Sequence, residues 1–153
     1  MGISGGKVEK MFIGEYSHTI DEKGRVAIPA KFRASLKRGA VVTRGLDNCL
    51  FLYPRREWLE LAKKLASLPI SQKDARAFAR LMLAGAMDVN IDSQGRINLP
   101  VYLREYAKLK NSVVIAGLYT RLEIWNKDQW KKYKNNAEKG STNIAERLGE
   151  LGV

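Results

Sequence analysis

The sequence predicts an α+β protein with a mainly β core, built from two tandem copies of one unit and connecting helices. The first observation is an internal repeat: residues 18–33 read HTIDEKGRVAIPAKFR, and residues 89–104 read VNIDSQGRINLPVYLR. The second is hydrophobic periodicity, because short segments within each copy alternate apolar and polar residues, whereas longer segments outside the copies carry apolar residues at helical spacing. Together these observations predict a duplicated strand-rich unit with helices between and after the copies.

The repeat is ordered, since the matched residues recur at a spacing of 71 residues and, after a one-residue insertion, of 72. Five identities are separated by 71 residues: Asp21, Gly24, Arg25, Pro29 and Arg33 recur as Asp92, Gly95, Arg96, Pro100 and Arg104. Two further strand segments follow in each copy, at Ala40–Thr43 and Cys49–Tyr53 and again at Ser112–Ala116 and Leu122–Trp125. Such order over some forty residues indicates tandem duplication.

Each copy begins with a predicted β-hairpin. Residues 16–20 alternate between apolar and polar up to Asp21, and the alternation resumes at Val26. A three-residue hairpin loop favours a left-handed position at its end, which Gly24 adopts without a Cβ penalty. Asp21 is placed to accept a turn N–H. The second copy has the same residue types at the same places.

The helices follow from proline positions and apolar spacing. Pro29 and Pro100 each suit the first turn of a short helix, because an N–H is not required there. Longer helices are predicted over 58–65, 74–86 and 126–139, with a short final helix over 144–151. The helix over 74–86 is expected to be amphipathic, with Phe78, Leu81 and Met82 on its apolar face.

These elements define the expected organisation of the chain. We expect unit 1 over residues 15–57, a helical connector over 58–85, unit 2 over 86–129 and C-terminal helices over 130–153. The two units are expected to share one core. Residues 1–10 form an extension expected to lie outside it, and they have no apolar segment typical of a signal peptide.

Composition narrows the function classes. Lys and Arg total 27 against 16 Asp and Glu, a formal charge of +11, which points first to nucleic acid and less often to an anionic membrane. The single Cys49 and the single His18 argue against a disulfide framework, a metal site and a histidine-dependent triad. No apolar run reaches the ~20 residues that span a bilayer, and no phosphate-binding loop is present. We expect a cytoplasmic protein without a cofactor that is not an enzyme.

The sequences DEKGR and DSQGR are the strongest functional candidates. Their plain interpretation is hairpin chemistry, with each arginine a solvated partner of its aspartate. In the functional interpretation, Arg25 and Arg96 meet a phosphate or a guanine edge with a planar guanidinium, while Asp21 and Asp92 orient them. Two copies favour the second interpretation, because turn chemistry alone does not require arginine at this place.

Three further basic residues are candidates for DNA contact. Lys23 lies in the first predicted turn, and Arg33 and Arg104 each follow a proline by four residues. Either arginine could contact phosphate or pair instead with an aspartate or a carbonyl. The lysine-rich run at 127–139 is more typical of a solvated helix with Trp130 and Tyr133 packed inward.

The motif D-x-x-G-R-[VI]-x-[IL]-P-x-x-[LF]-R resembles the swapped-hairpin signature of AbrB/SpoVT-type DNA-binding proteins. Two copies preceded by MFIGEY resemble the MraZ family. The resemblance implies a tandem swapped-hairpin β-barrel whose Asp21/Arg25 and Asp92/Arg96 motifs touch double-stranded DNA.

That resemblance also implies a biological role. It indicates a nucleoid-associated transcriptional regulator at the promoter of the division and cell-wall gene cluster, including its own gene. It further implies ring-like homo-oligomers on short G-rich direct repeats, without a membrane partner. The alternative is an antitoxin-like DNA-binding protein of the same fold that grips a toxin through its C-terminal region.

Overall fold

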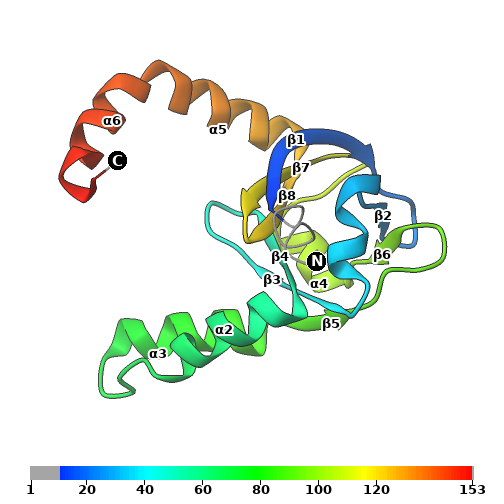
Figure 1. The fold of residues 1–153 in the computed structure, drawn as a ribbon, viewed down its shortest axis with the longest axis horizontal. Coiled ribbons are helices and arrows are strands. Elements are labelled where there is room, and N and C mark those ends of the chain that lie inside the picture. Colours follow the sequence, from blue (N-terminus) through cyan, green and yellow to red (C-terminus); the bar gives the residue numbers. More distant parts are fainter. Residues whose placement is uncertain (1–10, 153) are drawn as a thin grey trace, which may run out of the picture.

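A six-stranded antiparallel sheet forms the centre of the molecule. The computed structural model describes residues 11–152, and the predicted extension at 1–10 lies outside the described residues. The strand order is β1-β7-β8-β4-β3-β5. The strands are β1 (Phe12–Thr19), β3 (Ala40–Arg44), β4 (Leu50–Pro54), β5 (Met87–Val89), β7 (Ser112–Tyr119) and β8 (Arg121–Asn126). Figure 1 shows this sheet at the core, with helices extending to one side.

A second sheet is a ribbon of two short strands, β2 (Arg25–Ala27) and β6 (Arg96–Asn98). They pair antiparallel, with Arg25 opposite Asn98, Val26 opposite Ile97 and Ala27 opposite Arg96. The expected closed barrel is therefore wrong for residues 11–152. The central sheet stays open because its outer strands β1 and β5 pair inward only, and the chain beyond each of them enters the separate ribbon.

The predicted hairpin pairing also needs correction. The arms before and after the first turn touch through one bridge, Ile20 to Val26, and β2 then pairs with its counterpart from the other copy. The outer strands exchange in the same way, since β1 pairs with β7 of copy 2 and β5 pairs with β3 of copy 1. With the pairing of β4 and β8 at the centre of the sheet, four strand pairings join the two copies.

The two faces of the central sheet bury different apolar clusters. On one face, strand residues such as Leu52 and Ile124 pack against Val26 and Ile97 of the ribbon. Short helices close this cluster: two 3₁₀ turns, η2 (Ala30–Phe32) and η3 (Ala34–Leu36), in copy 1, and α4 (Val101–Tyr106) in copy 2. The ribbon is thereby seated on the core by its apolar side.

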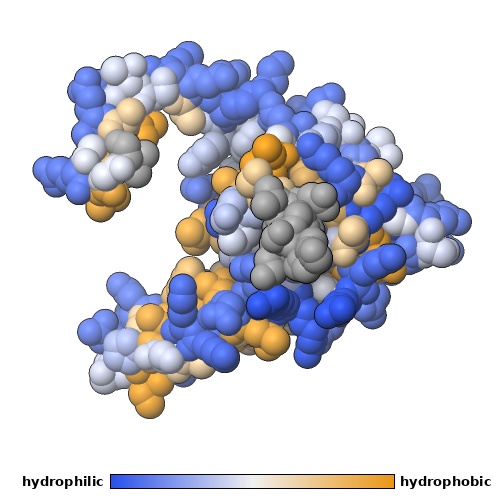
Figure 2. Space-filling view, viewed as in Figure 1, coloured by the Kyte–Doolittle hydropathy of each residue, from blue (hydrophilic) through white to orange (hydrophobic). Residues whose placement is uncertain are grey.

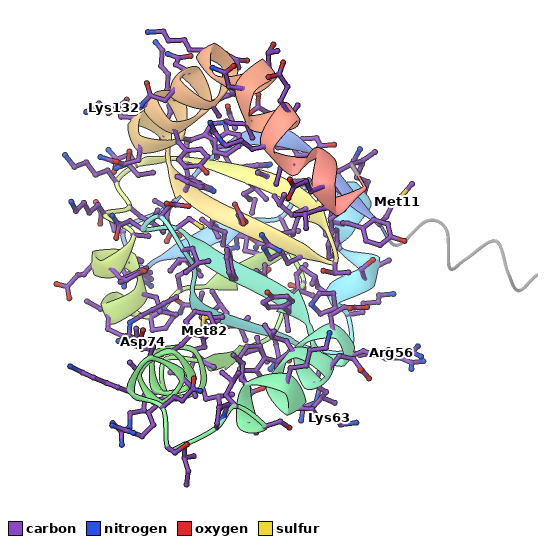
Figure 3. The ribbon with its side chains drawn as sticks, turned by 90° about the vertical axis from the view of Figure 1, so that its left-hand side faces the viewer. Met11, Arg56, Lys63, Asp74, Met82 and Lys132 are labelled. Carbon is purple, nitrogen blue, oxygen red and sulfur yellow. The ribbon has the colours of Figure 1, made fainter. Side chains whose placement is uncertain are left out.

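The opposite face is covered by the connector. It consists of α2 (Arg55–Ala66), α3 (Lys73–Ala79) and a π-helical turn, η4 (Arg80–Ala84). Met82 is buried and lies between the helices and the sheet in Figure 3. Thr43 donates its hydroxyl to the Met82 carbonyl at 2.7 Å, which fixes the side of the turn that faces the sheet. Of the three residues predicted to share the apolar face, Met82 alone is buried, and Phe78 and Leu81 are exposed.

The C-terminal helices form an arm. α5 (Lys127–Lys139) begins directly after β8. It is followed by α6 (Ser141–Leu148) and η5 (Gly149–Leu151), which extend away from the body (Figure 1). Every residue from 141 to 152 is exposed. Among the described helices none is long and apolar enough to cross a membrane.

Candidate nucleic-acid interface

The first turn is built around the Asp21 carboxylate. Its Oδ1 accepts the backbone N–H of Lys23 at 3.0 Å and of Arg25 at 2.8 Å, while Oδ2 accepts Arg25 Nε–H at 2.7 Å. Gly24 completes the turn with a φ of +86°, as the sequence predicted. The backbone N–H of Arg25 is the main cause that holds the pKa of Asp21 below its usual value, and the guanidinium adds to it. Asp21 is therefore ionised at neutral pH and orients the arginine beside it.

The second turn repeats this arrangement. Asp92 Oδ1 accepts the backbone N–H of Gln94 at 2.8 Å and of Arg96 at 2.9 Å, and Oδ2 accepts Arg96 Nε–H at 3.0 Å. Gly95 has a φ of +78°. The backbone N–H of Arg96 leads the causes that lower the pKa of Asp92. Because each arginine binds its aspartate through Nε, its terminal N–H groups can donate to a further acceptor.

The ribbon brings the two arginines onto one surface. Opposed residues in an antiparallel pair point to the same face, so the Arg25–Asn98 and Ala27–Arg96 pairs share one face. Val26 and Ile97 lie on the other face, and both are buried. Arg25 and Arg96 are diagonal neighbours, which places the two residues about 7–8 Å apart, with their Cβ atoms somewhat closer. Both side chains remain about one-third exposed, at 34% and 28%.

The three other candidates for DNA contact, Lys23, Arg33 and Arg104, differ in how the structure uses their side chains. Lys23 is exposed in the first turn, with its backbone N–H bound to Asp21. Arg33 Nε donates to the Ile28 carbonyl at 2.8 Å, and Arg104 Nε donates to the Leu99 carbonyl at 2.9 Å. Of the interpretations left open by the sequence, pairing with a carbonyl is the one the structure shows.

Sequence reasoning missed Asn98, which is exposed beside Arg25 on the outer face of the ribbon. Asparagine is one of the side chains that reads base edges. Its counterpart in copy 1 is Ala27, so the repeat alone gave no signal for it. The signal lies in the register between the copies, which a sequence pattern does not show.

Comparison with known proteins agrees with the duplication. A family model described as "MraZ protein, putative antitoxin-like" matches the chain twice, over residues 11–81 and 82–151. The chain belongs to the MraZ family. The transcriptional regulator MraZ of Thermoanaerobacter pseudethanolicus is 52% identical over 143 residues, covering 94% of this chain and all of the relative.

Other MraZ relatives give the same result. Proteins of the same printed name from Syntrophomonas wolfei and Carboxydothermus hydrogenoformans are 50% and 52% identical, over 94% and 90% of this chain. They are covered over 100% and 96% of their own lengths. The family resemblance and the repeat predicted from the sequence are both confirmed.

In this MraZ-family chain the basic helix α5 packs by its aromatic face, as predicted. The rings of Trp130 and Tyr133 each lie with centroids 5.2 Å from Trp125 of β8. Glu15 on β1 accepts the Trp130 indole N–H and Lys134 Nζ–H, the latter at 2.9 Å. The hydrogen bond from Lys134 is the main cause that lowers the pKa of Glu15. α5 is thus anchored to the sheet by its inner side.

Cys49 and His18 stand apart from the ribbon's outer face. Cys49 is buried, and burial raises the pKa of its thiol. His18 pairs with Val113 in the central sheet, and partial burial, followed by the charge of Arg33, lowers its pKa. In residues 11–152, no group of three His, Cys, Asp or Glu side chains could hold a metal ion.

Proposed function

We propose that this chain is a sequence-specific DNA-binding transcriptional regulator that reads DNA with the β2–β6 ribbon. The observation that carries the proposal is the pair Arg25 and Arg96 on the outer face of a ribbon whose inner face is buried. The formal charge of +11 supports attraction to a polyanion. The relatives described above are named as transcriptional regulators, which supports the same activity.

The dimensions suit a major groove. A groove about 12 Å wide admits a two-stranded ribbon, and an arginine fork matches the O6 and N7 acceptors of guanine. A diagonal separation of about 7–8 Å corresponds to roughly two base steps of 3.4 Å. The two arginines would therefore contact bases about two positions apart, consistent with a short G-rich motif. Asp21, Asp92 and Lys23 belong to the same site, the aspartates as supports and the lysine as a phosphate contact.

We also propose that the fold is a tandem swapped hairpin of the AbrB/SpoVT type. The exchange of β1, β5 and the paired β2 and β6 between the copies supports this. One chain would then do what a homodimer does in single-copy relatives. The units would be residues 15–57 and 86–129, with the connector at 58–85 and the helices at 130–153 outside them.

The partner and location follow as proposals from the family. We place the protein in the cytoplasm on the nucleoid, at short G-rich direct repeats upstream of the division and cell-wall gene cluster and its own gene. Homo-oligomers, closed into rings, would engage several repeats at once. In support, exposed apolar residues lie both on the connector and on the C-terminal arm, among them Phe78 and Leu81 on the connector and Ile144 and Leu148 on α6. Figure 2 shows apolar surface on the connector and on the C-terminal arm, which lie on the opposite side of the molecule from the ribbon in Figure 1.

The test of base reading replaces Arg25 by lysine, which keeps the charge and removes the rigid fork. Cognate and scrambled duplexes are titrated at one fixed salt concentration. We expect the preference for the cognate repeat to fall by about 1–3 kcal/mol, with little change on scrambled DNA. Arg56→Lys is the matched control, since Arg56 on α2 is exposed and points away from the body (Figure 3).

Two outcomes would overturn the proposal. Equal losses on both duplexes would refute base reading by Arg25, and so would unchanged binding to both, which is the result expected if Arg25 is only a counter-charge that lysine can replace. No binding of wild-type protein to its own upstream region in a footprint at moderate salt would favour the antitoxin-like alternative. Assembly is tested separately by light scattering coupled to size exclusion, where a mass of 17.2 kDa at micromolar concentration would refute the oligomer.

A further inference from the structure

The two turn glycines are buried, although the turns themselves are exposed. Residues 21–23 and 92–94 are all exposed, whereas Gly24 and Gly95 are each covered. A positive φ explains why glycine is favoured at these positions, but it does not explain their burial. Something from elsewhere in the chain must lie over each turn.

The covering group is an arginine of the other copy. A Cβ built on Gly95 would lie 2.3 Å from both Cζ and Nε of Arg33. A Cβ built on Gly24 would lie 2.6 Å from Nε and 2.8 Å from Cζ of Arg104. Each guanidinium therefore rests directly on the backbone of a turn glycine, and a Cβ at either position would have to displace it.

Hydrogen bonds tie the same pieces together. The Ile28 backbone N–H donates to the Gly95 carbonyl at 2.9 Å, and the Ile28 carbonyl accepts from Arg33 Nε at 2.8 Å. In the other half, the Leu99 N–H donates to the Gly24 carbonyl at 2.8 Å, and its own carbonyl accepts from Arg104 Nε. One residue of each copy is thus clamped between its own arginine and the turn of the other copy.

We propose that Arg33 and Arg104 are positioning residues, each acting on the DNA-reading turn of the opposite copy. Arg33 fixes Gly95 and so aims Arg96, and Arg104 fixes Gly24 and so aims Arg25. This inference rests on the proposed function, because it assumes that Arg25 and Arg96 read bases. It departs from the expectation that Arg33 and Arg104 touch phosphate themselves.

The residue type fits this role. The guanidinium lies against the glycine while its Nε donates to a carbonyl, whereas a lysine side chain has neither the planar group nor a donor at the Nε position. Arg33→Lys and Arg104→Lys therefore keep the charge but remove the contact. A positioning residue should then affect sequence preference, and a phosphate contact should affect all DNA alike.

The binding experiment is a set of double variants titrated on cognate and scrambled duplexes. We expect Arg33→Lys to lower the preference for cognate DNA by about tenfold, with scrambled binding and its salt slope unchanged. The loss should vanish in an Arg96→Ala background and persist in an Arg25→Ala background, because Arg33 lies on the turn that carries Arg96. Arg104→Lys should show the reverse pattern.

A phosphate role predicts a different result. Arg33→Lys would then weaken both duplexes equally, or leave both unchanged, in either background. If the loss caused by Arg33→Lys adds fully to that of Arg25→Ala and also to that of Arg96→Ala, the assignment of Arg33 to the turn of the other copy is overturned. Arg56→Lys again serves as the control for a charge-preserving change.

Hydrogen–deuterium exchange of the full chain without DNA tests the same contact independently of the proposed function. Arg33→Lys should speed exchange in a peptide over residues 92–96 by about tenfold and leave 21–25 unchanged. Arg104→Lys should do the opposite, and Arg33→Gln provides a second variant of Arg33. Exchange that rises only in the variant's own copy, or in neither copy, would refute the inference. If exchange follows the expected cross-copy pattern but Arg25→Ala leaves DNA binding unchanged, the inference stands and the proposed function is refuted.

Discussion

Gly95→Ala is the most informative single change for stability, because two separate penalties meet at that position. The backbone φ of +78° is one that L-residues rarely adopt. The added Cβ would also occupy the place of the Arg33 guanidinium, 2.3 Å from its Cζ. Arg33 would have to leave, and its bond to the Ile28 carbonyl would be lost.

The two penalties can be given separate magnitudes. A left-handed conformation costs a non-glycine residue about 1–2 kcal/mol. Loss of a hydrogen bond from a charged donor costs about 1.5–3 kcal/mol. We therefore expect Gly95→Ala to lower the free energy of unfolding by about 2.5–5 kcal/mol.

Gly39→Ala supplies the matched control. Gly39 also has a positive φ, +106°, but the nearest atoms to a Cβ there are 3.8 Å and 3.9 Å away. Its substitution should cost only the backbone penalty, about 1–2 kcal/mol. In an Arg33→Ala background, Gly95→Ala should fall to the same range, since the guanidinium is gone.

The assay is equilibrium denaturation at one fixed protein concentration, because assembly would make stability depend on concentration. Each glycine variant is compared with its parent, with and without Arg33→Ala. If Gly95→Ala proves no more destabilising than Gly39→Ala, or if the Arg33→Ala background leaves its cost unchanged, the close approach of Arg33 is refuted.

Three other predictions follow from the structure. The pKa values of Asp21 and Asp92 are lowered in the folded state. The two carboxylates therefore stabilise the fold fully above the usual carboxyl pKa, and this stabilisation is lost as the pH falls below about 4. Replacing either aspartate by asparagine should weaken this acid dependence of the melting temperature. Glu15→Ala removes the acceptor of the Trp130 indole N–H, so tryptophan emission should shift to the red and limited proteolysis should cut near α5 sooner, with unchanged spectra arguing against the anchor. Cys49 is buried and its thiol pKa is raised, so a thiol reagent should label it only after denaturation, and prompt labelling of native protein would contradict this burial.

The local features of the turns could be predicted from sequence because their causes are local. Asp21 reaches N–H groups two and four residues onward, and Gly24 lies three residues along, so the pattern D-x-x-G-R contains the whole arrangement. The same holds for the copy at Asp92. Prolines likewise marked the start of the short helices, since a proline restricts its own φ.

Long-range pairing could not be predicted in this way. Alternation of apolar and polar residues at Val26 shows that a strand has a buried face, but it is the same whether the partner is β1 or β6. The closed barrel failed for this reason. The role of Arg33 could not be decided from the sequence for a similar reason, because Gly95, which it contacts, belongs to the other copy. Phe78 was placed in the core because helical spacing assumes a regular α-helix, and the π-helical turn that follows it changes the register.

The interlocked copies also bear on the shape of the proposed DNA site. A two-fold symmetric reader favours a palindrome, because each half presents the same residues. Here the ribbon has nearly two-fold pairing but unequal side chains: Asn98 corresponds to Ala27, and Gln94 corresponds to Lys23. Duplication within one chain allows this difference, which no homodimer of a single unit could have. A ribbon with unlike halves distinguishes the two directions along DNA, and such a reader is suited to repeats that all point the same way.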